Sequence, residues 1–259
     1  MHIWPIFVLN QLLEAAEGLY NMNILTAIRK EMLVPIHPAG WPFIGLFGVL
    51  TLVLGFSFGP FFLIGVPATL WSVYFFRNPE RIPPLDERAV IAPADGRILN
   101  TSICDVPPEI DLPKGDWRCI SIFMNVFDVH VNRSPLSGVV CGKHYVKGKF
   151  VNASLDKAST HNERLALVLD TGIKQAPKIG FVQIAGLVAR RILCDVDVGD
   201  RLAAGQIYGL IRFGSRVDVW LPASVEPQVR AGQKSIAGET VLARLPEARA
   251  KRQRRKAKA

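Results

Sequence analysis

Val198 to Gly209 reads VGDRLAAGQIYG, and this stretch decides the fold. It follows the pattern V-G-D-x-L-x-x-G-Q-x-x-G. The glycines and the aspartate supply tight turns, and the apolar residues between them alternate toward the interior. The stretch therefore predicts a β-hairpin inside a β-rich domain.

The pattern resembles the hairpin unit of biotinyl- and lipoyl-type domains and of other duplicated hybrid-motif β domains. Those carrier domains hold their group on a lysine at the hairpin tip. No lysine occupies the tip here, so a carrier role is disfavoured.

Short runs rich in valine and isoleucine continue on both sides of this stretch, separated by Gly, Pro and Asp. Regular spacing of short strands and turns predicts a mostly β (α+β) catalytic domain, sandwich-like or barrel-like, over residues 79–245. The expected strands are Ala89–Ile91, Cys119–Phe123, Val139–Val140, Ala166–Leu169, Phe181–Ile184, Ile207–Ile211 and Val217–Leu221.

A hydrophobic segment, 36–78, precedes that domain. No charged residue occurs across the 37 positions from Gly40 to Phe76. One membrane-spanning helix needs about 20 apolar residues, so the run is long for one span and short for two. Gly59-Pro60 lies near its middle, and basic residues flank it on both sides. Both flanks favour the cytoplasm, which predicts a helical hairpin or re-entrant anchor; a tilted span and a buried helix are the alternatives.

The two termini complete the organisation. Residues 1–35 carry leucines at helical spacing and predict an amphipathic helix. The basic tail, 246–259, is expected to be disordered and accounts for much of the net charge of +9. Such a charge favours an anionic membrane surface. The chain has no nucleic-acid-binding signature, and its four cysteines have no metal-site or disulfide spacing.

Three places carry residues of catalytic type: Asp95 before Gly96, His130 after an expected strand, and Ser215 between two expected strands. Taken alone, Asp95 is more typical of a turn, His130 of a structural histidine, and Ser215 of a bend. Together they are the residue types of a nucleophilic triad.

Ser215 lacks the G-x-S-x-G elbow of a hydrolase, because its setting is F-G-S-R-V. Its hydroxyl can instead reach the carbonyl of the preceding residue, Gly214. Glycine permits the strained backbone that such an attack requires.

In seven segments the chain resembles the short bacterial and archaeal type of phosphatidylserine decarboxylase, from about Ile36 to about Leu242. The segments are IHPAGWPFI (36–44), FFRNPERIPP (75–84), APADGRI (92–98), SIFMNVFDVHVNRSP (121–135), GKFVNASLDKAS (148–159), NER (162–164) and GDRLAAGQIYGLIRFGSRVDVWLP (199–222).

The resemblance implies a carboxy-lyase that cuts itself between Gly214 and Ser215 into a β chain, 1–214, and an α chain, 215–259. Ser215 would become a covalent pyruvoyl cofactor. His130 would be the base for cleavage, and Asp95 would orient it. The pyruvoyl group would form a Schiff base with phosphatidylserine, releasing CO2 and phosphatidylethanolamine. The two chains would stay together as a heterodimer, with further homo-oligomerisation left open.

Phe127 stands where some relatives have a second histidine, so another group must supply a proton, or the phenyl ring keeps the site dry. Asn152 and Ser154 are candidate substrate contacts, with loop residues as the equal alternative. Basic residues near the site, namely Arg77, Arg81 and Arg133, could attract the lipid phosphate or could simply face the cytoplasm.

The expected location is the cell membrane, with the catalytic domain on its cytoplasmic face. Two other function classes stay open. A membrane-bound serine hydrolase or a non-catalytic β module would each keep an intact chain. A soluble amino-acid substrate is the alternative to a lipid, and the long anchor favours the lipid.

Overall fold

The computed structural model describes residues 34–148, 153, 161–174, 176–186, 191–212 and 214–246. Residues 1–33 of the expected N-terminal segment lie outside this range. So do residues 247–259 of the basic tail.

The described strands are short, and every named pair is antiparallel. They are β1 (Ala89–Ile91), β2 (Gly96–Cys104), β3 (Trp117–Met124), β4 (Val131–Arg133), β5 (Gly138–Val146), β6 (Arg164–Asp170), β7 (Lys178–Ala185), β8 (Ile192–Cys194), β9 (Arg201–Leu202), β10 (Ile207–Ile211), β11 (Ser215–Pro222), β12 (Lys234–Ser235) and β13 (Val241–Arg244).

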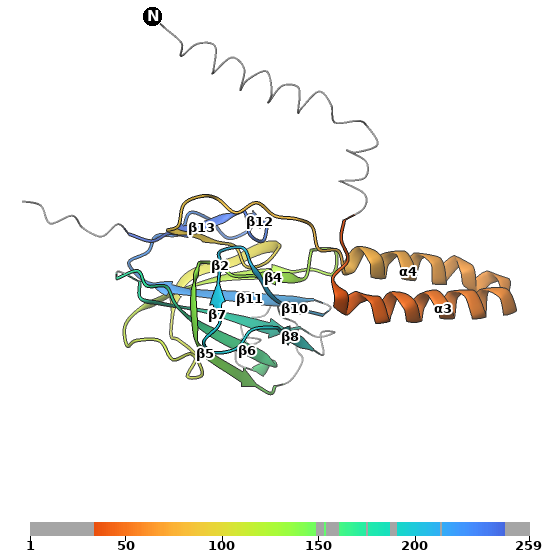
Figure 1. Ribbon diagram of the computed structural model, residues 1–259, viewed down its shortest axis with the longest axis horizontal. Helices are drawn as coiled ribbons and strands as arrows, with labels where there is room; N and C mark the ends of the chain where they lie inside the picture. Colours follow the sequence, from red (N-terminus) through yellow and green to blue (C-terminus); the bar gives the residue numbers. More distant parts are fainter. Residues whose placement is uncertain are drawn as a thin grey trace, which may run out of the picture.

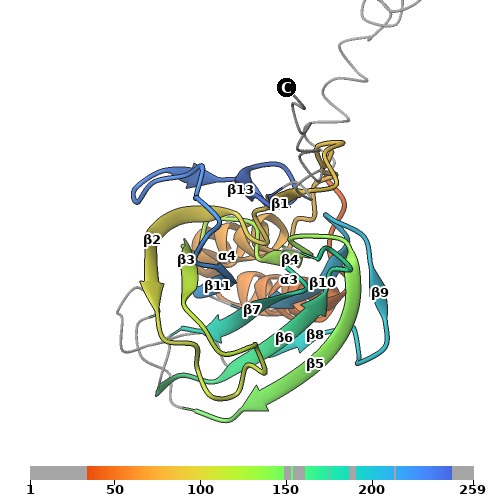
Figure 2. The same cartoon turned by 90° about the vertical axis from the view of Figure 1, so that its left-hand side faces the viewer.

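The main sheet has the order β12-β2-β3-β11-β7-β6-β5-β9. It curls around the core, with the helices behind it in Figure 2. Strand β11 lies near the middle, between β3 and β7. Its alternate residues Val217 and Val219 face the main core, whereas Trp220 packs in a second cluster on the opposite face. This curled sheet confirms the predicted mostly β fold class.

Two smaller sheets, β4-β10-β8 and β1-β13, complete the domain. The stretch 198–209 forms β9 and β10, joined by a tight turn in which Gly205 has φ +79°. The hairpin predicted for this stretch does not form: β9 pairs with β5, whereas β10 pairs with β4 and β8 in another sheet. The turn bonds instead to Ser134. The main-chain nitrogen of Ser134 donates to the Gln206 oxygen at 2.7 Å, and the main-chain oxygen of Ser134 accepts from the Gly205 nitrogen at 2.9 Å. The turn therefore joins two sheets.

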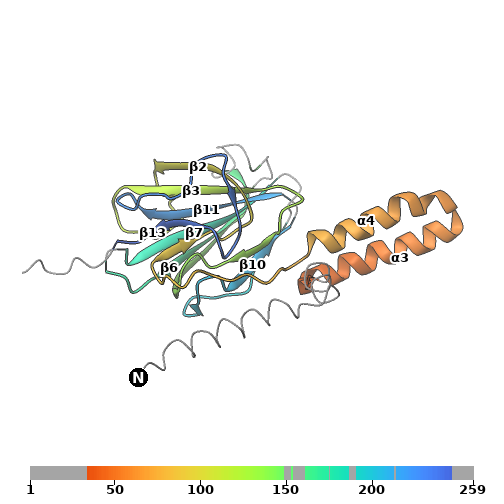
Figure 3. The ribbon, with the colours of Figure 1, turned by 90° about the horizontal axis from the view of Figure 1, so that it is seen from above.

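The uncharged run folds as two antiparallel helices, α3 (Trp41–Ser57) and α4 (Phe62–Phe75). The one-turn helices η1 (Pro38–Gly40) and η2 (Gly59–Phe61) precede them, and η2 contains the Gly59-Pro60 dipeptide. Thr51 and Thr69 join α3 to α4 through a hydrogen bond between their hydroxyl groups at 3.1 Å. Figures 1 and 3 show this hairpin projecting from one end of the β domain.

Apolar side chains cover the outside of the hairpin, including Phe56 at 82% and Leu63 at 79% exposure. Pro38–Ser57 is long and apolar enough to cross a membrane, judged by length and composition alone. Water is a poor solvent for such a surface, so the hairpin fits an apolar environment.

The base of the hairpin is packed into the β domain. Phe75 and Phe76 are buried, and they share a cluster with Val129, Val131 and Leu210. The end of α4 therefore contacts β4, which directly follows His130, and β10, which precedes Gly214 and Ser215.

Candidate active site

The Gly214–Ser215 peptide bond lies at the start of β11. Ser215 is fully buried and lies opposite Met124 of β3 and Ala185 of β7. Gly214 has φ +71°, in the left-handed region where a side chain is strained. The bond thus joins a turn to a strand that is paired on both sides, which fixes Ser215 in place.

His130 directly precedes β4 and points at this bond. Its Nε2 accepts a hydrogen bond from the Gly214 nitrogen at 3.2 Å. Its Nδ1 lies 2.9 Å from the main-chain oxygen of Asp128. A carbonyl only accepts, so Nδ1 carries the ring hydrogen and Nε2 keeps its lone pair. The imidazole is therefore fixed in the tautomer that can take up a proton beside Gly214.

Burial keeps that imidazole neutral. His130 has no exposed surface, and the ring of Phe75 lies over it with centroids 4.3 Å apart. Burial lowers the pKa of His130 to about 4, and the nearby positive charge of Arg77 acts in the same direction. The hydrogen bond to the Asp128 carbonyl opposes the shift. At neutral pH His130 is therefore an unprotonated base.

The serine hydroxyl and the scissile carbonyl have different neighbours. The hydroxyl of Ser215 donates to the sulfur of Met124 at 3.9 Å, not to His130. The carbonyl oxygen of Gly214 is packed against Gly186, where an added Cβ would lie 2.1 Å from it. Gly186 thus leaves the space that this carbonyl needs.

Asp95 bonds to groups other than His130 among the described residues. Its carboxylate accepts from Arg81 at 2.8 Å and from the nitrogen of Ala237 at 2.7 Å. Burial raises the pKa of Asp95, and the Ala237 N–H and the charge of Arg81 partly offset this effect. The same segment meets β4, because the nitrogen of Arg133 donates to the Pro93 oxygen at 2.9 Å. These hydrogen bonds therefore connect the segment of Asp95 to the strand after His130 through the main chain.

The structure describes only one of the three candidate substrate-binding residues, Phe127. Phe127 is 62% exposed in the turn before His130, so it does not cover the imidazole. Asn152 and Ser154 lie outside the described residues.

Phe75, Met124 and Gly186 were not predicted from the sequence. The aromatic pair that ends the uncharged run was the available signal for Phe75, whereas Met124 and Gly186 become neighbours of the site only through strand pairing.

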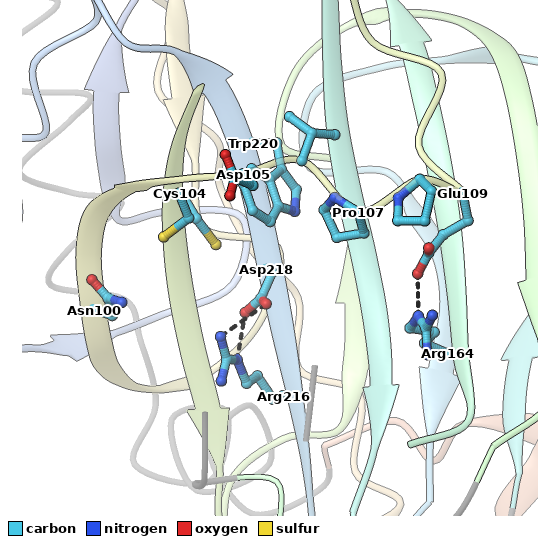
Figure 4. Close-up of a pocket in the computed structure, with 12 residues that line it drawn as sticks. Asn100, Cys104, Asp105, Pro107, Glu109, Arg164, Arg216, Asp218 and Trp220 are labelled. Atoms are coloured by element: carbon cyan, nitrogen blue, oxygen red, sulfur yellow. Dashed lines mark hydrogen bonds and ion pairs between the residues drawn. The ribbon is translucent and has the colours of Figure 1, made fainter. Parts of the chain in front are cut away.

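A cavity of about 670 Å³ lies on the opposite face of β11 from Ser215. Figure 4 shows Arg216, Asp218 and Trp220 lining it, with Arg216 bonded to Asp218 at 2.6 and 2.9 Å. Because neighbouring residues of a strand point to opposite faces, this cavity is separated from Ser215 by the sheet. Burial and chemistry, not cavity size, identify the candidate site. Among the described residues no group of three or more His, Cys, Asp or Glu could hold a metal ion.

Known proteins resemble this chain over most of its length. The phosphatidylserine decarboxylase family pattern matches residues 68–243, which include Asp95, His130 and the Gly214–Ser215 bond. The chain belongs to the phosphatidylserine decarboxylase family. It is 51% identical over 222 residues to the phosphatidylserine decarboxylase proenzyme of Beijerinckia indica subsp. indica, covering 86% of this chain and 94% of that protein. Membership confirms the predicted family and makes the chain a decarboxylase.

Proposed function

We propose that this decarboxylase converts phosphatidylserine to phosphatidylethanolamine and CO2, using a pyruvoyl group made from Ser215 by cleavage after Gly214. One observation carries the proposal: a buried, neutral imidazole has its Nε2 3.2 Å from the nitrogen of Gly214. The word proenzyme in the name of the Beijerinckia relative supports processing of that protein.

Cleavage begins when the Ser215 hydroxyl attacks the Gly214 carbonyl and His130 takes up its proton. The Gly214 acyl group shifts from the main-chain nitrogen of Ser215 to its side-chain oxygen, so that an ester replaces the amide. Loss of the Ser215 α-proton then breaks the Cβ–O bond and releases Gly214 as a carboxylate. The dehydroalanine left on residue 215 takes up water, releases ammonia and leaves the pyruvoyl group.

The described residues fit these steps. Attack requires the Ser215 hydroxyl to leave the sulfur of Met124, its partner at 3.9 Å, and to turn to the carbonyl. Gly214 has a left-handed backbone, and Gly186 leaves room for its carbonyl oxygen. Asp95 acts as a positioning residue, because its ion pair with Arg81 holds the segment that bonds to β4.

The pyruvoyl group supplies a ketone that takes up the substrate amine as a Schiff base and accepts the electrons left by CO2. Residue 215 stays at the start of a strand paired with β3 and β7. These hydrogen bonds hold the α chain, 215–259, to the β chain, 1–214, after cleavage. The proposed product is therefore a heterodimer of the two chains.

The helical hairpin anchors the enzyme at its lipid substrate. Its apolar surface and the adjacent basic residues support attachment to the cytoplasmic face of the cell membrane. Ser215 lies close to the base of the hairpin, because His130 bonds to the neighbouring Gly214 and packs against Phe75, the last residue of α4. A lipid head group could reach the site without leaving the bilayer.

Intact-mass measurement of the purified chain and its Ser215→Ala variant tests the proposal. We expect two fragments split after Gly214 in the unaltered protein, the smaller without a free amine, and one chain in the variant. Released CO2 from phosphatidylserine vesicles should follow the fragments. A single folded chain in both samples would contradict cleavage and favour the serine hydrolase or the non-catalytic module.

A further inference from the structure

Two arginines lie side by side at the base of the hairpin. The nitrogen of Arg212 donates to the Arg191 oxygen at 3.3 Å. The Nε of Arg212 is buried and has no hydrogen-bond partner within the part of the chain that the structure describes. Burial lowers the pKa of Arg212, and the positive charge of Arg191 lowers it further. A half-buried guanidinium with a like-charged neighbour and no ion-pair partner among the described residues is suited to an anion.

The other basic residues near the site have partners already. Arg77 donates to two main-chain carbonyl oxygens, each at 2.7 Å. Arg81 is paired with Asp95 at 2.8 Å. Arg133 donates to three oxygen atoms at 2.9 to 3.2 Å. These three arginines therefore hold the fold, and Arg212 keeps an unused donor.

Arg212 lies on the segment that carries the cleavage bond. The nitrogen of Ile211 donates to the His130 oxygen at 3.3 Å, and the nitrogen of Gly214 donates to the His130 ring at 3.2 Å. Arg212 lies three positions before Ser215 in the sequence, a distance of at most about 10 Å along the chain. The guanidinium carbon lies 5.0 Å from the ring centre of Phe43, in the first turn of α3. The charge thus sits where the apolar hairpin meets the catalytic domain.

We propose that Arg212, assisted by Arg191, binds the phosphodiester of a glycerophospholipid beside Ser215. The inference rests on the proposed function and adds the substrate group that is recognised. The phosphate of phosphatidylserine is joined to the serine side chain through one oxygen. Holding the phosphate at Arg212 therefore brings the substrate amine close to residue 215. Free serine lacks this group, so the site would select the lipid over the amino acid.

The first measurement is decarboxylation of dihexanoyl phosphatidylserine in detergent micelles by Arg212→Gln and Arg212→Lys. Arg230→Gln is the matched control, because Arg230 is exposed and lies on the loop before β12. Loss of a charge-assisted, two-donor contact should raise KM about 10- to 100-fold. We expect kcat within about threefold of the unaltered enzyme and partial recovery in the lysine variant. Arg230→Gln should leave both constants unchanged.

The phosphodiester could also belong to a neighbouring lipid that docks the protein. Sedimentation with phosphatidylglycerol vesicles separates the two sources. If Arg212 holds a docking lipid, Arg212→Gln loses vesicle binding while KM for the micellar substrate stays unchanged. If it holds the substrate, KM rises and vesicle binding matches that of Arg230→Gln. Either result supports a phosphodiester site.

A third measurement needs no processing and no turnover. Glycerophosphoserine is titrated into Ser215→Ala protein, with and without Arg212→Gln or Arg230→Gln. We expect weaker binding only with Arg212→Gln. Equal binding in all three proteins, with unchanged KM and vesicle binding, would overturn the inference. Arg212-dependent binding in a chain that neither cleaves nor decarboxylates would leave the site standing and remove the proposed reaction.

Discussion

The ring of Phe75, the last residue of α4, lies over the imidazole of His130 with centroids 4.3 Å apart and planes at 34°. Phe75 in turn contacts Phe76, which stacks on Phe43 of α3 at 5.4 Å. An unbroken set of aromatic contacts therefore joins the first turn of α3 and the last turn of α4 to the proposed base. The hairpin forms a wall of the site as well as an apolar projection.

Removing the Phe75 ring should change the pH dependence of cleavage. His130 has a pKa lowered to about 4, mainly by burial, from the usual 6.5. Protonation removes the base, so cleavage of the unaltered chain should hold down to about pH 5 and fall as pH nears 4. Phe75→Ala admits water, which should raise the His130 pKa and move this loss toward pH 6.5. Cleavage measured by mass against pH in freshly translated protein checks the shift.

Two variants separate this effect from general destabilisation. Phe75→Leu keeps most of the volume and should shift the profile less than Phe75→Ala. Phe56→Ala removes a ring that is 82% exposed and should leave the profile unchanged. Equal profiles in all three variants would mean that Phe75 does not set the environment of His130.

Gly186→Ala should block cleavage without unfolding the protein. The new Cβ would lie 2.1 Å from the Gly214 oxygen, so the scissile carbonyl must move away from its place beside Ser215. We expect at least a tenfold slower appearance of fragments, since displacements of about 1 Å can cost 100-fold. Gly48→Ala is the control, because nothing lies within 4 Å of its added Cβ. Normal cleavage in Gly186→Ala would show that the carbonyl tolerates the shift.

Asp95→Asn and Arg81→Gln should slow cleavage to a similar extent. Both remove the 2.8 Å ion pair between side chains that are each 15% exposed. A partly buried pair of this kind contributes about 1 to 2 kcal/mol to the position of its segment, so about a tenfold loss is expected. Cleavage time courses of both variants give the comparison. A loss confined to Asp95→Asn would instead indicate that the carboxylate acts on His130 directly.

Asp218→Asn should lower stability and leave the chemistry intact. Asp218 is 2% exposed and binds Arg216 through two short hydrogen bonds on the face of β11 opposite Ser215. Leaving the buried guanidinium without its carboxylate should cost about 3 kcal/mol of unfolding free energy. Denaturant unfolding of Ser215→Ala protein with and without Asp218→Asn measures this cost. Cleavage of the folded Asp218→Asn chain should proceed at the usual rate, since the sheet separates this pair from Ser215.

The order of residues along the chain determined much of this protein. Thirty-seven uncharged positions with Gly59-Pro60 in the middle predicted a helical hairpin, and α3 and α4 divide at that dipeptide. Alternating apolar runs predicted the strands, because a half-buried strand repeats every two residues. Seven motifs in order predicted the family. These signals are local or depend only on sequence order, so they need no knowledge of distant contacts.

Tertiary structure decided which groups meet. Strand pairing brings Met124 and Ala185 to the two sides of Ser215, although 91 positions of sequence separate Met124 from it. The hairpin folds back to place Phe75 on His130, and Asp95 turns to Arg81 and Ala237. Periodicity shows which face of a strand is buried but not which strand lies beside it. The neutral state of His130 and the unused donor of Arg212 follow from that long-range packing alone.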